Sequence, residues 1–157
     1  MFTNSILTKS IQLEPKHLTP HIKETIFEEL KLKYEKTCDD IGLIVSIDEI
    51  THIDNIINKD SIVITFYITF KAKTIKPEKG MFFSFKPSLI LQKGIFGKVH
   101  DKINFFIPES NLSENGYIFE NDQFISKNKK IDPNIDIHVK IIDFKYDTFK
   151  YNCIVHF

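Results

Sequence analysis

Apolar and polar residues alternate along residues 62–73, and this pattern predicts the longest strand of the chain. One side carries only apolar residues, namely Ile62, Ile64, Phe66, Ile68, Phe70 and Ala72. A period of two is typical of a strand with one buried face and one wetter face. Because Pro77 cannot donate a hydrogen bond to a neighbouring strand, we expect the sheet to end there. Gly80 then allows the chain to change direction.

The pattern upstream of this strand predicts one helix and two further strands. Residues 6–13 indicate a short strand, and apolar residues then recur at helical spacing up to Tyr34, opposite lysine and glutamate. Thr19 is the predicted N-cap and Pro20 the first helical residue. We expect this helix to end near residues 37–40. Residues 41–53 are rich in β-branched side chains and predict the second strand. A helix packed on one face of a small antiparallel sheet accounts for this order.

Beyond Gly80 the sequence predicts only short strands. Apolar stretches separated by Pro, Gly, Asn and Asp occur at residues 81–85, 88–92, 95–99, 103–107, 117–125, 135–144 and 149–157. Such regular spacing predicts a small closed barrel or a sandwich. The expected fold class is therefore an α+β domain over residues 1–79, followed by an all-β barrel or sandwich over residues 80–157.

Charge and composition limit what the protein can bind. Lys+Arg and Asp+Glu both number 21, so no net positive field attracts nucleic acid from a distance. Every basic residue of the two types is lysine, which excludes base-specific contacts by the arginine fork. The abundance of Ile, Asn, Lys and Phe suggests an AT-rich genome, either of a virus or of a unicellular organism. Cys38 and Cys153 are far apart and indicate reduced thiols rather than a disulfide framework.

The sequence does not predict an enzyme. It has no nucleophile elbow, no phosphate-binding glycine loop and no dinucleotide fingerprint. A cluster of Asp48, Glu49, His52 and Asp54 suggests a hard-metal site, but the polar face of a half-buried strand explains the same pattern. In an unbroken strand, Glu49 would lie on the opposite face from the other three. We therefore expect no catalytic residue, no metal ion and no cofactor.

Three stretches resemble the stalk subunit of multi-subunit DNA-directed RNA polymerases, the family of the eukaryotic seventh subunit, its archaeal equivalent and a small poxvirus counterpart. The first is Ile11-Gln12-Leu13-Glu14-Pro15 before the helix. The second is Phe70-Lys71-Ala72 with Ile75-Lys76-Pro77 and Lys79-Gly80, which is similar to the joint between the two domains of that family. The third is Lys93-Gly94-Ile95-Phe96-Gly97 with residues 106–112, which resembles the centre of an OB barrel.

The resemblance implies a non-catalytic subunit that docks beside the clamp and places an OB barrel near the RNA exit path. By matching position, the docking tip comprises Asp39, Asp40, Ile41, Gly42 and Leu43. Gly42 suits a tight turn that enters a narrow pocket. The other interpretation of Gly42, that it only ends the helix, stays open here. The family tends to carry glycine in the connector before the long strand, where this chain has residues 58–61 without glycine.

RNA contact would fall on the barrel strands, where bases stack on aromatic rings and lysines follow the phosphates. The candidate residues are Lys93, Phe96, Lys98, His100, Lys102 and Phe105. The alternative for the two aromatic residues is that they only fill the barrel interior. Because the charges balance, we expect any RNA binding to be weak and dependent on salt.

The family also implies the partners of the chain. These are the largest polymerase subunit, a small subunit at the clamp base, a helical stalk companion near Val63 and Tyr67, and nascent RNA. We expect an intracellular protein without a membrane span, in the virion and host cytoplasm if it is viral and in the nucleus otherwise. Two rival functions are a free-standing single-stranded RNA-binding protein with an OB fold and a small enzyme with a site around His52.

Overall fold

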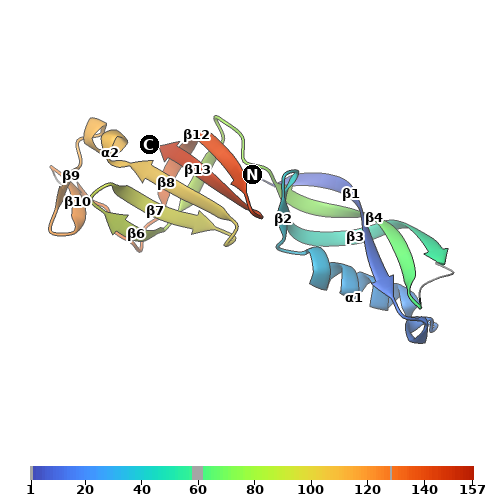
Figure 1. Ribbon diagram of the computed structural model, residues 1–157. Helices are drawn as coiled ribbons and strands as arrows, with labels where there is room; N and C mark the ends of the chain where they lie inside the picture. Colours follow the sequence, from blue (N-terminus) through green and yellow to red (C-terminus); the bar gives the residue numbers. More distant parts are fainter. Residues whose placement is uncertain (1, 58–61, 128) are drawn as a thin grey trace. The chain divides into compact units, whose positions relative to one another are not determined.

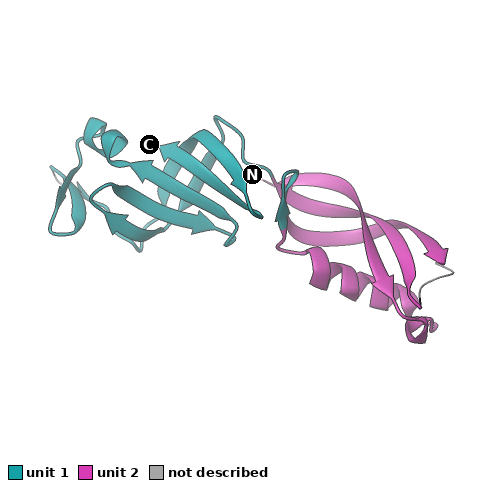
Figure 2. Cartoon of the chain, in the orientation of Figure 1, with its two compact units in different colours: residues 1, 38–42, 76–157 teal, residues 2–37, 43–75 magenta. Residues whose placement is uncertain are grey.

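The computed structural model describes residues 2–57, 62–127 and 129–157 (Figure 1). The chain forms two compact units (Figure 2): residues 2–37 and 43–75 make one, and residues 38–42 and 76–157 make the other. The glycine-free connector at residues 58–61 lies outside the described residues. Strand β4 ends at Ile75 and β5 begins at Phe82, so the chain passes between the units over the segment that contains Pro77 and Gly80.

The first unit contains one helix and the three long strands of an antiparallel sheet, as the sequence predicts. The sheet order is β1-β4-β3-β2, with β1 at Thr3–Leu13, β2 at Cys38–Asp39, β3 at Gly42–Ile57 and β4 at Ile64–Ile75. The short strand β2, which the sequence did not predict, is the fourth strand of this sheet. Both long partners of β4 run antiparallel to it. A 3-10 turn, η1 at Pro15–His17, leads from β1 towards helix α1 at Ile22–Tyr34.

The helix is shorter at both ends than the sequence suggested. Its N-cap is His21 rather than Thr19, and the Thr19 hydroxyl instead accepts a hydrogen bond from the backbone N–H of His21. The helix ends at Tyr34, and Lys36 adopts a left-handed backbone with a φ of 62°. The end of α1 is therefore well before Gly42, so the interpretation of Gly42 as the residue that ends the helix is wrong.

The core of the first unit follows the alternation along β4. Ile64, Phe66, Ile68, Phe70 and Ala72 are buried along one face of β4 and pack with Ile26 and Leu30 of α1. Ile62, which the alternation also placed on this face, precedes β4 and is 81% exposed. The helix thus covers one face of the sheet, as predicted. Thr65, Tyr67 and Thr69 occupy the other face and are half-buried or exposed.

Strand β3 departs from simple alternation, which corrects the predicted placement of its acidic residues. Register shifts occur at three places along its pairing with β4. As a result Glu49 pairs with Lys71 and His52 pairs with Thr69, and both lie on the uncovered face. The prediction that Glu49 lies opposite His52 is wrong because each bulge inserts a residue and reverses the side-chain parity.

The second unit is an OB-fold barrel. Its sheet order is β5-β12-β13-β8-β7-β6. The strands are β5 at Phe82–Phe85, β6 at Pro87–Leu91, β7 at Gly94–Val99, β8 at Ile103–Pro108, β12 at Ile137–Asp147 and β13 at Lys150–His156. Strands β8 and β13 pair in parallel, and the other neighbours are antiparallel. Only Lys86 separates β5 from β6, so one bent strand pairs with both edges and closes the sheet.

Aromatic side chains fill the barrel at the bend. The ring of Phe105 lies between Phe83 and Phe85, with ring centroids 5.3 and 5.2 Å away. Gly97 on β7 faces Phe85 so closely that an added Cβ would lie 2.0 Å from the Phe85 ring. The barrel can close here only because this position of β7 has no side chain.

An insertion between β8 and β12 contains a helix that the sequence did not predict. Helix α2, at Glu109–Glu114, buries Leu112 and Asn111. The Asn111 side-chain oxygen accepts a hydrogen bond from the backbone N–H of Phe157. A small sheet follows, of β9 at Ile118–Glu120, β10 at Gln123–Ser126 and β11 at Lys129–Lys130. A helix of six residues, which is less than two turns, is too short to leave an apolar periodicity in the sequence.

We predict that Gly97→Ala destabilises the barrel, since the new methyl group must displace the Phe85 ring from its stack on Phe105. We expect the free energy of unfolding to fall by about 1–3 kcal/mol, as for overpacked cores. Urea denaturation followed by tyrosine fluorescence measures the change. The control is Lys98→Ala at the adjacent exposed position, which should change it by less than about 0.5 kcal/mol. Equal effects of the two variants would contradict the close approach.

Candidate functional site

Strict alternation on β8 directs one set of side chains outward from the barrel. Ile103, Phe105 and Ile107 are buried, while Asn104 and Phe106 between them are partly exposed. Since neighbouring strands are in register, outward side chains on β7, β8, β13 and β12 form rows that cross the sheet. Two such rows lie next to each other.

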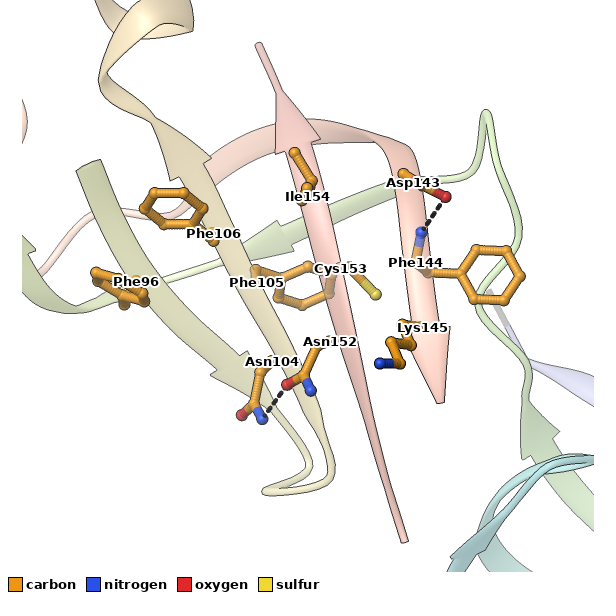
Figure 3. A pocket seen from close by; sticks show the side chains of 10 residues that line it. All are labelled: Phe96, Asn104, Phe105, Phe106, Asp143, Phe144, Lys145, Asn152, Cys153 and Ile154. Carbon is orange, nitrogen blue, oxygen red and sulfur yellow. Dashed lines mark hydrogen bonds between the residues drawn. The ribbon is translucent and has the colours of Figure 1, made fainter. Parts of the chain in front are cut away.

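The first row is apolar. Leu89 pairs with Phe96, Phe96 with Phe106 and Phe106 with Ile154, across β6, β7, β8 and β13. The rings of Phe96 and Phe106 are stacked, with centroids 4.7 Å apart and planes inclined by 28° (Figure 3). Ile154 retains 43% of its accessible surface. A row of partly exposed apolar side chains on a barrel wall offers a flat surface for a planar ligand.

The second row is polar and lies one step further along the strands. Lys98 pairs with Asn104, Asn104 with Asn152 and Asn152 with Lys145. The amide of Asn104 donates a hydrogen bond to the side-chain oxygen of Asn152, at 3.0 Å (Figure 3). The Asn104 oxygen and the Asn152 amide group lie beside the apolar row, with a lysine at each end of the polar row.

Six members of the two rows line a depression of about 500 Å³ on the barrel wall, namely Phe96, Phe106, Ile154, Asn104, Asn152 and Lys145. We call the two rows the barrel face, defined by Leu89, Phe96, Phe106, Ile154, Lys98, Asn104, Asn152 and Lys145. Acidic groups reduce its positive charge. Lys98 forms a 3.0 Å ion pair with Asp101, and this contact lowers the pKa of the Asp101 carboxyl. Asp143 continues the apolar row beyond Ile154, and its carboxylate accepts a hydrogen bond from the backbone N–H of Phe144.

The structure separates the six predicted RNA-contact residues. Phe96 and Lys98 lie on the barrel face. Phe105 is only 1% exposed, so its ring cannot stack on a ligand and instead fills the barrel interior. The remaining three lie in the turns at the two ends of β7: Lys93 before it, and His100 and Lys102 after it.

Sequence reasoning missed Phe106, Asn104, Asn152, Ile154 and Lys145 on this face. The polar residue Asn104 among apolar neighbours could have indicated which face of β8 points outward. A strand with Asn104 facing outward also has Phe106 outward and Phe105 inward. The contributions of β12 and β13 required the strand order, which the sequence pattern does not specify.

The predicted docking tip forms a tight turn between β2 and β3. The Asp39 carboxylate accepts hydrogen bonds from the backbone N–H groups of Ile41 and Gly42, at 2.9 and 3.2 Å. Gly42 has a φ of 143°, which favours glycine. Ile41 is 61% exposed at the turn, whereas Leu43 is fully buried and unavailable to a partner.

The base of this turn is held by polar contacts within its own unit. The Tyr151 hydroxyl donates a 3.0 Å hydrogen bond to the carbonyl of Asp39. Burial raises the pKa of Tyr151 above its usual value, and Cys38 and Asp39 add to the effect. Burial likewise raises the pKa of Cys38 to about 11, with Asp39 adding to it. The turn therefore presents Asp40 and Ile41 from a fixed base.

Two acidic residues of β3 contact different partners. The His52 ring lies 3.0 Å from the Asp54 carboxylate, and Lys71 lies 2.9 Å from Glu49. Within residues 2–57, 62–127 and 129–157, no three His, Cys, Asp or Glu side chains gather as metal ligands would. Among the same described residues, no helix is both long and apolar enough to cross a membrane.

Comparison with known proteins bears on the first unit. Residues 8–68 match the family model described as the SHS2 domain found in the N terminus of Rpb7p/Rpc25p/MJ0397. The match covers less than half of the 157-residue chain and spans the strand–helix–strand–strand core described above. It supports an Rpb7-like family, whose members are polymerase subunits. No curated protein matches the chain.

We predict that neither native thiol reacts readily at pH 8. Burial raises the pKa of Cys153 to about 12 and that of Cys38 to about 11, so both stay protonated as well as covered. A thiol-specific colorimetric reagent should label the folded chain many-fold more slowly than the chain in guanidinium chloride. A Leu32→Cys variant, with a thiol at a position that is 81% exposed, is the fast-reacting control. Rapid labelling of the folded wild type would contradict the burial.

Proposed function

We propose that this protein is a non-catalytic stalk subunit of a DNA-directed RNA polymerase. The observation that carries the proposal is the domain combination. An SHS2-type unit matching the N terminus of Rpb7-type subunits is followed in the same chain by an OB barrel. The N-terminal half of the chain then docks on the polymerase, and the barrel lies near the RNA exit path.

The docking contact that we propose is the turn at residues 39–42. Its apex offers one apolar side chain, Ile41, next to the carboxylate of Asp40, on a backbone held by the Asp39 side chain. A short apex of this kind suits a narrow pocket between the largest polymerase subunit and a small subunit at the clamp base. A helical stalk companion would bind the sheet face around Tyr67, which is 42% exposed.

The barrel face is the RNA contact that we propose. Bases would stack on the Phe96–Phe106 pair, and the amides of Asn104 and Asn152 would meet polar base edges. Lys98 and Lys145, at the two ends of the polar row, would contact the phosphates of the RNA. Stacking contributes about 1–3 kcal/mol per base, but the balanced charge of the chain provides little long-range attraction. Binding would therefore be weak for the free chain and stronger inside an assembly that holds RNA nearby.

We propose a viral member of this family, which would act in the virion and in the host cytoplasm. The composition fits the AT-rich genome of a virus and that of a unicellular organism alike. A cellular member would act in the nucleus. The alternative function is a free-standing RNA-binding protein that uses the same barrel face without polymerase partners.

Docking is tested by affinity purification of the tagged chain from its native or infected cells, with mass spectrometry of the proteins that accompany it. We expect wild type to recover the large polymerase subunits and Ile41→Lys to lose most of them. Gly42→Trp should lose them too, but its φ of 143° makes misfolding a competing cause, so Ile41 is the sharper position.

The matched control for docking is Ile135→Lys. Ile135 is 62% exposed, against 61% for Ile41, and lies in a barrel loop. Ile135→Lys should retain the polymerase subunits. If wild type recovers none of them, the stalk assignment is wrong and the free RNA-binding protein becomes the better hypothesis. If both lysine variants behave alike, the docking turn is wrong.

RNA contact is tested with a fluorescently labelled single-stranded oligouridine and the purified chain at low salt. We expect Phe96→Ala to weaken binding by about tenfold, because the base loses half of its stacking platform. The control is Phe82→Ala, which removes a 74% exposed ring that also lies near a lysine, Lys140, but outside the barrel face. A larger loss from Phe82→Ala, or no loss from Phe96→Ala, would exclude the barrel face as the contact.

A further inference from the structure

The two edges of the first unit's sheet are built differently. On one side, the bulges of β3 interrupt its pairing with β4 at three places, and β2 covers its start. On the other side, β1 pairs with β4 without interruption from Thr3 to Leu13. Within the described residues, β1 is the outermost strand on that side. Proteins normally blunt such edges with bulges, prolines or charges, because an intact edge invites another strand.

Helix α1 covers only one end of this edge. The Tyr34 hydroxyl and the Lys33 ammonium both donate to the carbonyl of Ser10, which therefore points away from β4. Because strand backbone groups alternate in direction, the backbone N–H and C=O groups of Ile6 and Thr8 point the same way. The length of edge that remains open runs from Thr3 to Lys9 and is centred on Ile6.

The open length has few features that would repel another strand. Lys9 is its only charged residue, and it contains no proline. Ile6 is 69% exposed in the middle of it, on the sheet face that α1 does not cover. An exposed isoleucine with outward backbone groups is both a hydrogen-bonding site and an apolar contact.

We propose that this edge pairs with a second copy of the same chain, antiparallel and about a twofold axis at Ile6. This register places Ile6 beside Ile6 of the second copy and Asn4 beside Thr8 of the second copy. Lys9 falls opposite Thr3, so the two lysines do not face each other. The pairing uses the whole open length in both copies and joins the two sheets into one, as in closed twofold dimers.

The register is tested by cross-linking single-cysteine additions in the full-length chain. The native thiols are buried, so an added surface cysteine is the reactive one. With a short bismaleimide reagent, Ile6→Cys should give a cross-linked dimer in high yield, because residue 6 faces itself. Asn4→Cys and Thr8→Cys should each give little dimer alone and a dimer when mixed, because residue 4 faces residue 8.

The backbone pairing is tested with proline on the same strand. Thr8→Pro removes an N–H that points away from β4, so the fold should tolerate it, while the intermolecular ladder loses a bond at two symmetric places. Light scattering after size exclusion, over a concentration series, should show wild type rising from 18.4 kDa towards twice that mass. Thr8→Pro should stay at the monomer mass with an unchanged circular dichroism spectrum, and Thr8→Ala should behave as wild type.

Three results would overturn the proposal: a wild-type mass that stays at one chain throughout the series, cross-linking of all three single-cysteine variants to the same extent, or dimerisation of a folded Thr8→Pro variant. These measurements use only the purified chain, so their outcome is independent of whether the chain accompanies a polymerase.

Discussion

The closure of the barrel depends on the close contact of Gly97 with the Phe85 ring. Because β7 carries no side chain at that point, Phe85 can lie between Gly97 and the ring of Phe105. The strand that contains Phe85 can then bend at Lys86 and pair with β12 on one side and β7 on the other. This bend closes the sheet and so gives the barrel an interior. On each strand, the side chains that do not face this interior point outward.

The barrel face is a consequence of this closure rather than of any local sequence motif. Its apolar row comes from four strands, and its polar row unites β7, β8, β13 and β12. Parallel pairing of β8 with β13 places Asn104 next to Asn152, although 48 positions separate them in the chain. A stacked ring pair beside an amide pair can bind planar groups that have polar edges. Nucleic-acid bases have this chemistry, which is why we propose this face as the RNA contact.

The sheet of the first unit does not close into a barrel, so it has two faces and two edges that must be covered or left exposed. Its helix covers one face of the sheet, and bulges disrupt the β3 edge. The β1 edge is intact, and side chains of α1 hold only its far end. The turn at residues 39–42 interrupts this unit in the sequence, and there a carboxylate fixes the backbone while a single isoleucine projects. The N-terminal half of the chain thus offers two specific points of contact, a turn and a strand edge.

The sequence by itself determined the class of each unit. Alternation predicted β4 and its buried face, helical spacing predicted α1 to within a few residues, and short apolar stretches predicted most barrel strands. These features are local, because they depend on the period of the backbone. Only the tertiary structure decided the face of Glu49, since a bulge reverses parity without a distinct sequence signal. It also placed Phe105 inside and Phe106 outside, and it brought Asn152 and Ile154 to the barrel face, because strand order arises from long-range pairing that no local pattern encodes.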